Sequence, residues 1–199
     1  MNVIGISYLE GFNCEPKFRR KVSKILSGMD DYTVVFSDDP SSLITQYFSE
    51  EQPQKILHRV DGLADANLTH AIFFDDGSIS IPFSQKHPNV TCRKVAIKVT
   101  QVINLKKHPN RPALEASEQY EYIGRGSYWG NPHSMYETGE DREEVIRKFK
   151  YDFEHDLFPN KSRGEVHKLH GKTLGCFCSP APCHGDVLAE YLNSYDDGQ

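Results

Sequence analysis

Short apolar runs rich in β-branched and aromatic residues alternate with amphipathic segments through the first hundred residues. The apolar runs predict buried strands at 2–7, 32–36, 69–74 and 95–99. The segments between them predict helices at 17–26 and 41–49. Strands that alternate with helices form mainly parallel sheets with both faces covered. The first half is therefore expected to be an α/β domain that binds ligands beyond the carboxyl ends of its strands.

The second half continues the α/β pattern on a smaller scale. Asp141 precedes a long amphipathic segment and predicts a helix that this residue caps. Residues 174–178 predict a short buried strand, which a Pro-rich turn joins to a further helix. Between the halves, residues 106–120 are polar and show no period, which predicts a linker. The expected domains are therefore 1–105 and 121–199.

The composition limits the classes of partner. The formal net charge of −5 argues against a broad nucleic-acid surface, which needs many basic side chains to neutralise phosphates. The sequence contains no apolar run of membrane-spanning length and no signal-peptide pattern, so we expect a cytoplasmic protein without a membrane partner. In that compartment the five cysteines are expected to be free thiols or metal ligands.

Three of these cysteines gather around the turn between the 174–178 strand and the following helix. Zinc bound by Cys176, Cys178, Cys183 and His184 is one interpretation, because the ligand types suit the metal. A second interpretation is a reactive Cys183 thiolate, stabilised by the helix N-terminus and by His184. In a third, Cys176 and Cys178 are core residues, since free cysteine is often buried.

A glycine-rich segment, 124–132, follows another short predicted strand. Its glycines would allow the backbone to approach a ligand closely, and Arg125 offers a bidentate donor for phosphate or carboxylate. Trp129 could stack on a base or sugar, and Asn131 could bind a base edge. A nucleotide or a phosphosugar is therefore the expected ligand. The predicted binding residues are Gly124, Arg125, Gly126, Ser127, Trp129 and Asn131.

A second candidate ligand position lies at the end of the 69–74 strand. Asp75 and Ser78 stand at its carboxyl end, where ribose hydroxyls or a metal could bind. The alternative is a solvated acidic turn.

Both halves resemble known families. Residues 121–193 are similar to an uncharacterised domain family of bacteria and phages, whose markers are a GRGxxWGNP segment and a GCxCxPxPCHGDVL segment. The chain has both, at 124–132 and 175–188. This resemblance favours a functional pocket at Cys183, His184 and Asp186, and it implies the host cytoplasm if the source is a phage.

Residues 1–105 are similar to the SLOG superfamily, the Rossmann-like nucleotide-binding domains related to the DprA and LOG proteins. The likeness lies in segment 65–78, where a helix leads into a strand that ends in an Asp-Gly-Ser loop. The resemblance implies a Rossmann-like fold and a nucleotide ligand. The Gly-Gly-Ala-x-Gly phosphate loop of that superfamily is absent, and residues 36–40 stand in its place.

These observations favour an enzyme that cleaves or transfers at a glycosidic or phosphate bond of a nucleotide or nucleotide-derived metabolite. In this hypothesis Arg125 and the amides of 183–186 hold phosphate, while Trp129 and Asn131 hold the base or sugar. It requires the arginine–tryptophan loop and the start of the last helix to line one hollow.

The catalytic residues would be Cys183, as nucleophile or metal ligand, and His184 or Asp186, as acid and base. Two alternatives remain open at this point. One is a non-catalytic protein that binds or sequesters a nucleotide, and the other is an interaction module stabilised by zinc.

Overall fold

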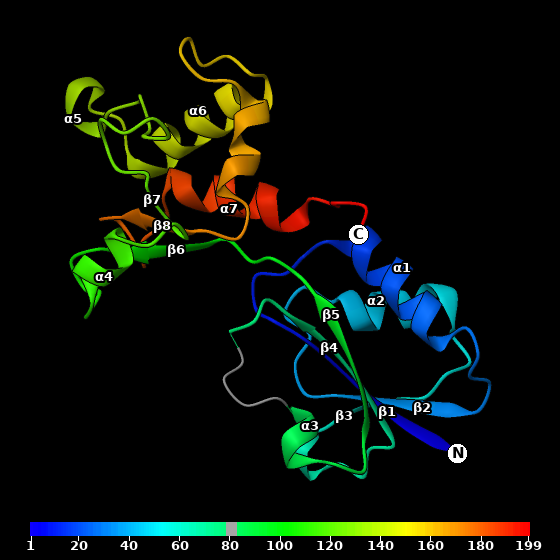
Figure 1. Cartoon of the computed structure of the whole chain (residues 1–199). Coiled ribbons are helices and arrows are strands. Elements are labelled where there is room, and N and C mark those ends of the chain that lie inside the picture. The colour runs from blue at the N-terminus through cyan, green and yellow to red at the C-terminus, as the bar shows by residue number, and fades with distance from the viewer. Residues whose placement is uncertain (79–82) are drawn as a thin grey trace. The chain divides into compact units, whose positions relative to one another are not determined.

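The chain consists of two compact units, each with its own parallel sheet (Figure 1). The computed structural model describes residues 1–78 and 83–199. The first unit comprises Met1–Lys98 and Ser194–Gln199, and the second comprises Val99–Asn193. No helix within the described ranges is long and apolar enough to cross a membrane.

The first unit contains a five-stranded sheet in the order β3-β2-β1-β4-β5, and every neighbouring pair is parallel. This arrangement confirms the predicted Rossmann-like α/β fold. The strands are β1 (Asn2–Tyr8), β2 (Tyr32–Phe36), β3 (Leu57–Arg59), β4 (His70–Asp75) and β5 (Thr91–Ala96).

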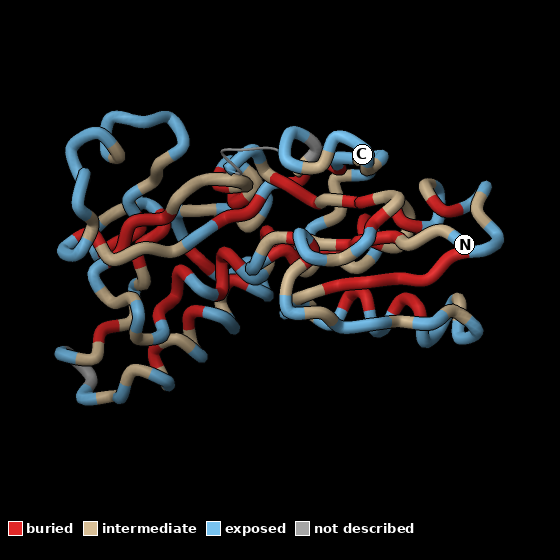
Figure 2. The backbone as a smooth tube through the Cα atoms, turned by 90° about the horizontal axis from the view of Figure 1, so that it is seen from below, coloured by how far each residue is buried: buried red, intermediate tan, exposed pale blue. Residues whose placement is uncertain are grey.

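Apolar contacts cover both faces of this sheet, as adjacent residues of β4 show. Phe74 stacks on Phe18 of one covering helix, with ring centroids 5.0 Å apart. The next side chain, Phe73, points to the opposite face and contacts Phe83 at 4.9 Å. Figure 2 shows the resulting buried stretches along the strands. The helices are α1 (Glu15–Leu26), α2 (Leu43–Glu51), the 3₁₀ turn η1 (Leu63–Asp65) and α3 (Phe83–Lys86).

The edge strands of this sheet differ from the prediction. The strand predicted at 95–99 is β5, which begins earlier, at Thr91, and ends at Ala96. Its residues are mostly exposed, so polar side chains replace the apolar run that marks a central strand. The short edge strand β3 has no buried residue and was not predicted.

The second unit contains a three-stranded parallel sheet in the order β6-β8-β7. Central β8 carries Leu174, which is fully buried among side chains of the two longest helices, such as Phe149 and Leu188. The strands are β6 (Gln101–Asn104), β7 (Tyr120–Tyr122) and β8 (Thr173–Cys176). The helices are α4 (Arg111–Glu115), α5 (Met135–Thr138), α6 (Arg142–Glu154), the 3₁₀ segment η2 (Arg163–Leu169) and α7 (His184–Ser194).

The segment predicted as a linker, 106–120, belongs to the second unit. It contains α4 and leads from β6 into β7, and the division between the units falls after Lys98. The linker prediction failed because α4 buries none of its residues, so its composition is that of an exposed loop. The predicted cap of α6 is confirmed, since Asp141 Oδ1 accepts a hydrogen bond from the Glu144 amide at 2.8 Å.

Candidate functional site

The loop after β7 is a compact double turn. The amide of Ser127 donates to the carbonyl of Gly124, and the amide of Gly130 donates to the carbonyl of Ser127, both at 3.1 Å. A Cβ on Gly130 would lie 2.6 Å from the Gly124 carbonyl oxygen, so no larger residue fits without moving backbone. Gly126 has a φ of 82°, which also favours glycine. These glycines therefore set the shape of the loop.

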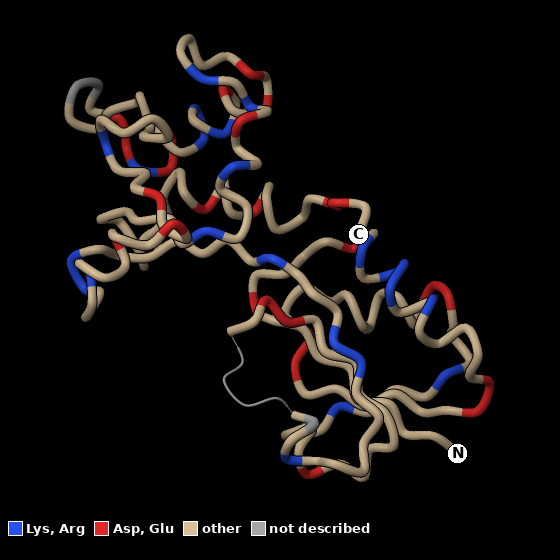
Figure 3. The backbone as a smooth tube through the Cα atoms, in the orientation of Figure 1, with Lys and Arg blue, Asp and Glu red and all other residues tan. Residues whose placement is uncertain are grey.

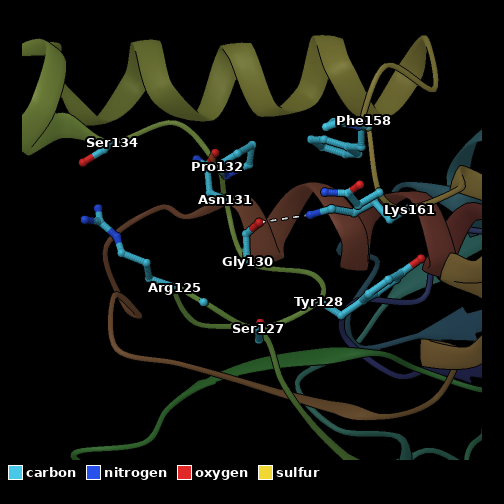
Figure 4. Close-up of a pocket in the computed structure, with 12 residues that line it drawn as sticks. Arg125, Ser127, Tyr128, Gly130, Asn131, Pro132, Ser134, Phe158 and Lys161 are labelled. Carbon is cyan, nitrogen blue, oxygen red and sulfur yellow. Dashed lines mark hydrogen bonds between the residues drawn. The ribbon is translucent and has the colours of Figure 1, made fainter.

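This loop and the segment after α6 enclose a pocket of about 440 Å³, here called the loop pocket. In Figure 4 the side chains of Arg125 and Lys161 lie on either side of Gly130 and Asn131. Lys161 Nζ donates to the Gly130 carbonyl at 3.2 Å and lies 4.4 Å from the Phe158 ring centroid. Partial burial lowers the pKa of Lys161. The pocket therefore places two cationic side chains around a rigid backbone.

Trp129 does not line this pocket, contrary to the prediction that it stacks on a ligand. It is 4 % exposed and belongs to the core cluster of the unit, beside Phe158 and Val166. Its neighbour Tyr128 lines the pocket instead and is about half exposed. The prediction was wrong because a tryptophan between polar residues can point inward when distant segments provide apolar contacts.

Asn131 lines the pocket, but its side-chain amide also has a structural role. Its Nδ2 donates to the Val145 carbonyl of α6 at 3.0 Å, and its Oδ1 accepts from the His133 amide at 2.9 Å. Ser127 Oγ is buried and has no hydrogen-bond partner among the described residues. Of the two, Ser127 has the greater capacity to bind a ligand.

A second, smaller pocket of about 140 Å³ adjoins the first and is called the thiol pocket. Arg125 and Asn131 line both pockets. The structure thus brings the arginine loop and the start of α7 together, as the sequence predicted, but Trp129 and Asp186 line neither pocket. The residues around the thiol pocket are Gly124, Arg125, Asn131, His133, Met135, Arg142, Val145, Ile146, Cys176, Phe177, Cys178, Pro182, Cys183 and His184.

The three thiols of this pocket interact with one another. Cys176, at the end of β8, accepts hydrogen bonds from the thiols of Cys183 and Cys178 and from the Cys178 amide. These bonds lower the pKa of Cys176 to about 5. The pKa of Cys183 is raised, because its thiol is the donor to Cys176 and because it is buried. The lowered pKa therefore falls on Cys176 and the raised one on Cys183, the thiol that the sequence singled out as reactive.

His184 is buried and hydrogen-bonded to the backbone. Its Nε2 lies 2.8 Å from the Ile123 carbonyl oxygen, so Nε2 carries the proton. The ring packs edge-on against Phe149, with centroids 5.0 Å apart. Burial lowers the pKa of His184, which keeps the imidazole neutral at physiological pH. The side chain lines the thiol pocket and also joins α7 to the loop.

Asp186 has a capping role. Its Oδ2 accepts the backbone N–H of Cys183 at 2.7 Å, which satisfies a donor at the start of α7. The residue is exposed and lies outside both pockets. The prediction of an acid/base role for Asp186 therefore has no support from its position.

The predicted zinc ligands do not form a metal centre. Among the described residues, no group of three or more His, Cys, Asp or Glu side chains is arranged to hold one ion. Cys183 and His184 are adjacent in the sequence, and the bond of His184 Nε2 to the Ile123 carbonyl leaves Nδ1 as its remaining acceptor. The thiols of Cys176, Cys178 and Cys183 hydrogen-bond to each other instead. The described residues therefore give the zinc-stabilised module no support.

The minimal SLOG domain family matches residues 1–103, which is more than half of the chain. The chain belongs to the minimal SLOG family. A domain of unknown function (DUF4326) matches residues 103–194 and covers both pockets. Both matches confirm the resemblances inferred from the sequence motifs, and the SLOG domain suggests a nucleotide-related role.

One relative comes from a phage. It is an uncharacterised 12.4 kDa protein in the nrdA–td intergenic region of Enterobacteria phage T4, 40% identical over 79 residues. The match covers 36% of this chain and 65% of the phage protein. No solved structure matches the chain.

In the SLOG unit, the two predicted ligand residues form a turn. Asp75 is buried, accepts the Gly77 amide at 3.0 Å and lies 2.5 Å from Lys94 Nζ. Ser78 is exposed, and its amide donates to Asp76 at 2.9 Å. These contacts form a turn, as in the alternative interpretation, but Asp75 is buried rather than solvated and Lys94 balances its charge.

A third pocket, also of about 440 Å³, lies at the carboxyl end of β2 and is called the SLOG pocket. Asp39 lines it and accepts four hydrogen bonds: from Tyr8 Oη at 2.6 Å, the Ile44 amide at 3.0 Å, and the amide and hydroxyl of Thr45 at 2.9 and 2.8 Å. Burial and the bond to Asp39 raise the pKa of Tyr8. Asp39 therefore occupies the helix N-terminus that would otherwise attract a phosphate.

Sequence reasoning missed two basic residues of the site. Lys161 lies in a polar stretch after α6, and Arg142 is the first residue of α6 and lines the thiol pocket. Neither belongs to the two motif segments. A possible signal for Lys161 is that Phe158 and Pro159 precede it, since an apolar pair in a polar segment often anchors a loop against the core.

Proposed function

We propose that this protein binds a nucleotide or nucleotide-derived metabolite in the loop pocket of its second unit, with anionic groups on Arg125 and Lys161. The observation that carries the proposal is the charge of the lining. Two cationic side chains face the pocket, and none of its lining residues in the described part of the chain is acidic. Such a pocket favours phosphate or carboxylate groups.

Other lining groups suit the rest of such a ligand. Tyr128 offers a half-exposed ring on which a base or sugar could pack, and its hydroxyl is held by Glu165. Ser127 supplies a hydroxyl with no partner among the described residues. A phosphosugar shares the same anionic chemistry, so both ligand classes belong in the test.

The acidic lining of the SLOG pocket also supports placing the ligand in the loop pocket. Asp38 and Asp39 both line it, and Asp39 occupies the N-terminus of α2. A phosphate placed there would meet a carboxylate in the position that an anion usually takes. This contrast supports the proposal that a nucleotide binds in the loop pocket of the second unit.

The test is a thermal-shift and calorimetry screen of nucleoside mono- and diphosphates, sugar phosphates and inorganic phosphate. We expect a phosphorylated ligand to raise the melting temperature. Lys161→Met and Arg125→Met should each weaken its binding about 10- to 100-fold, the value of one charge-assisted hydrogen bond. Methionine removes the charge of each side chain and keeps an unbranched apolar chain.

The matched control is Arg59→Met, which removes an arginine from the lining of the SLOG pocket. Binding should not change in this variant. If no phosphorylated compound binds, or if Arg59→Met abolishes binding while the other two variants retain it, the proposal is wrong.

Cleavage or transfer at a glycosidic or phosphate bond is the second candidate function. The observation that favours it is that Arg125 lines both the loop pocket and the thiol pocket. A ligand held by Arg125 would thus lie next to the three thiols of the thiol pocket. Incubating each bound compound with the protein and separating the products distinguishes an enzyme, which consumes it, from a protein that binds or sequesters it.

A further inference from the structure

We propose that His133 is the general base of the thiol pocket, that Asp152 orients its imidazole ring, and that the bond broken there is that of a phosphate ester. This inference rests on the cleavage function named above as the second candidate. It assigns to that function a base, a nucleophile and a bond.

The first support is the pairing of the two side chains. His133 Nε2 lies 2.7 Å from Asp152 Oδ2. A carboxylate oxygen accepts this hydrogen bond, so Nε2 carries the proton and Nδ1 of the neutral ring is left as an acceptor. An imidazole whose acceptor nitrogen is oriented by a carboxylate on the other side of the ring is the arrangement that a general base needs.

The second support is that the loop around His133 is held on α6 at two positions. Asn131 Nδ2 donates to the Val145 carbonyl at 3.0 Å, and Asn131 Oδ1 accepts the His133 amide at 2.9 Å. Asp152 lies about two turns further along the same helix. The backbone and the ring of His133 are therefore both fixed, which gives its Nδ1 a defined direction.

The third support is the lining of the thiol pocket. His133, Arg125 and Arg142 all line it, and no acidic residue does so in the described part of the chain. Two guanidinium groups suit the oxygens of a phosphate. A volume of about 140 Å³ is below that of pockets for whole drug-sized ligands. Arg125 and Asn131, drawn in Figure 4, also line the loop pocket, so the rest of the ester can extend there.

Geometry also distinguishes His133 from His184, the other histidine of this pocket. His184 is 6 % exposed, and its Nε2 bonds to a backbone carbonyl, so no carboxylate would balance the charge of its protonated ring. The side chains of His133 and Asp152 are 28% and 24% exposed. His133 can therefore take up a proton beside a carboxylate and return it to solvent.

The reaction is a hydrolysis in which water is the nucleophile. His133 Nδ1 takes a proton from water while the water oxygen forms a bond to phosphorus. The bond from phosphorus to the ester oxygen breaks, and that oxygen leaves with the bonding pair. His133 then passes the proton to the leaving oxygen or to solvent, and Asp152 balances the charge of the ring in between. The reaction requires no oxidant or reductant.

The experiment incubates the purified full chain with p-nitrophenyl phosphate and with bis(p-nitrophenyl) phosphate and follows the release of p-nitrophenol. We expect hydrolysis of at least one ester above the protein-free rate. His133→Gln should lower kcat about 100-fold or more with little change in KM, because a base acts only in the chemical step. Glutamine keeps a donor for Asp152, so the melting temperature should change little.

Asp152 is a positioning residue and needs a different measurement. Asp152→Asn keeps an oxygen acceptor for the ring but removes the charge, so kcat should fall about 10-fold or more. Asp152→Glu, which retains the carboxylate, should restore part of this loss. A purely structural link between the loop and α6 would instead lower the melting temperature and leave kcat of the folded protein unchanged.

His155→Gln is the matched control. His155 is exposed at the end of α6, packs on Tyr151 with ring centroids 4.4 Å apart and lines neither pocket of this unit. Its substitution should leave hydrolysis unchanged. If the unmodified protein hydrolyses neither ester, or if His133→Gln retains full turnover, the proposal is wrong.

The nucleotide screen can fail separately. Hydrolysis that depends on His133, without a thermal shift by any phosphorylated compound, would support the base and reject the loop-pocket ligand. A thermal shift without hydrolysis of either ester would support the ligand and reject the base.

Discussion

Two pockets of this protein have the same volume and opposite chemistry. The SLOG pocket and the loop pocket each measure about 440 Å³. Asp38 and Asp39 line the first, beside Arg59, whereas Arg125 and Lys161 line the second. Figure 3 shows acidic and basic residues along both units, so the contrast is local and does not extend to whole domains. The comparison shows that the charge of the lining, more than its size, determines which pocket can hold an anion.

The largest expected effect tests whether Trp129 anchors the loop of the loop pocket to the core. Trp129→Ala should reduce the free energy of unfolding by about 3–5 kcal/mol, because it removes a buried aromatic ring from the core cluster. The measurement is urea denaturation monitored by far-UV circular dichroism. Tyr128→Ala, at the adjacent half-exposed position, should cost less than about 1 kcal/mol. If the two variants were equally stable, Trp129 would not be a core residue.

The next prediction tests whether Asp39 caps the N-terminus of α2 beside the SLOG pocket. Asp39→Ala should destabilise the protein by about 2–3 kcal/mol, since it removes the cap of α2 and leaves the buried Tyr8 hydroxyl without its acceptor. Asp38→Ala is the matched control. That side chain is 83% exposed, and its ion pair with Arg59 spans 4.0 Å, so the loss should be below about 0.5 kcal/mol. Equal losses from the two substitutions would contradict the capping role.

A smaller effect concerns the acid sensitivity of the second unit. Because burial lowers the pKa of His184 from its usual 6.5, the unfolded chain takes up this proton before the folded protein does. Stability should be complete above pH 6.5 and should fall as the pH drops towards the folded pKa. The slope contributed by one proton is at most about 1.4 kcal/mol per pH unit.

Urea denaturation at pH 7.5, 6.5 and 5.5 measures this slope. His184→Gln keeps a donor for the Ile123 carbonyl but has no titrating group, so its stability should vary less over the same range. A variant with the same slope as the unmodified protein would show that other groups cause the acid sensitivity.

The sequence predicted central elements well and edges poorly. β1, β2 and β4 are buried on both faces, so they appear as continuous apolar runs. β3 and β5 lie at the edges of their sheet and carry exposed polar residues, which resemble loops. Local patterns therefore indicate burial only where it is nearly complete.

The same limit applies to the site. The two motif segments predicted that Arg125 and the cysteines share a pocket, because short strands bring both segments to one end of a small sheet. The sequence could not predict that the three thiols shift one another's pKa values, because that depends on their contacts in the fold. The inward position of Trp129 likewise depends on residues far along the chain, such as Phe158 and Val166.

The smallest expected effect compares the two helix caps directly. Asp186→Ala should cost about 1 kcal/mol, because Asp186 accepts one backbone bond at the start of α7, while Asp39 accepts four groups. Glu190→Ala, an exposed position of the same helix, is the control and should be near neutral. If Asp186→Ala left stability unchanged but abolished turnover of a ligand found in the screen, Asp186 would be an acid or base after all. The two caps would then differ in function as well as in stability, because Asp186 would take part in catalysis and Asp39 would only stabilise α2.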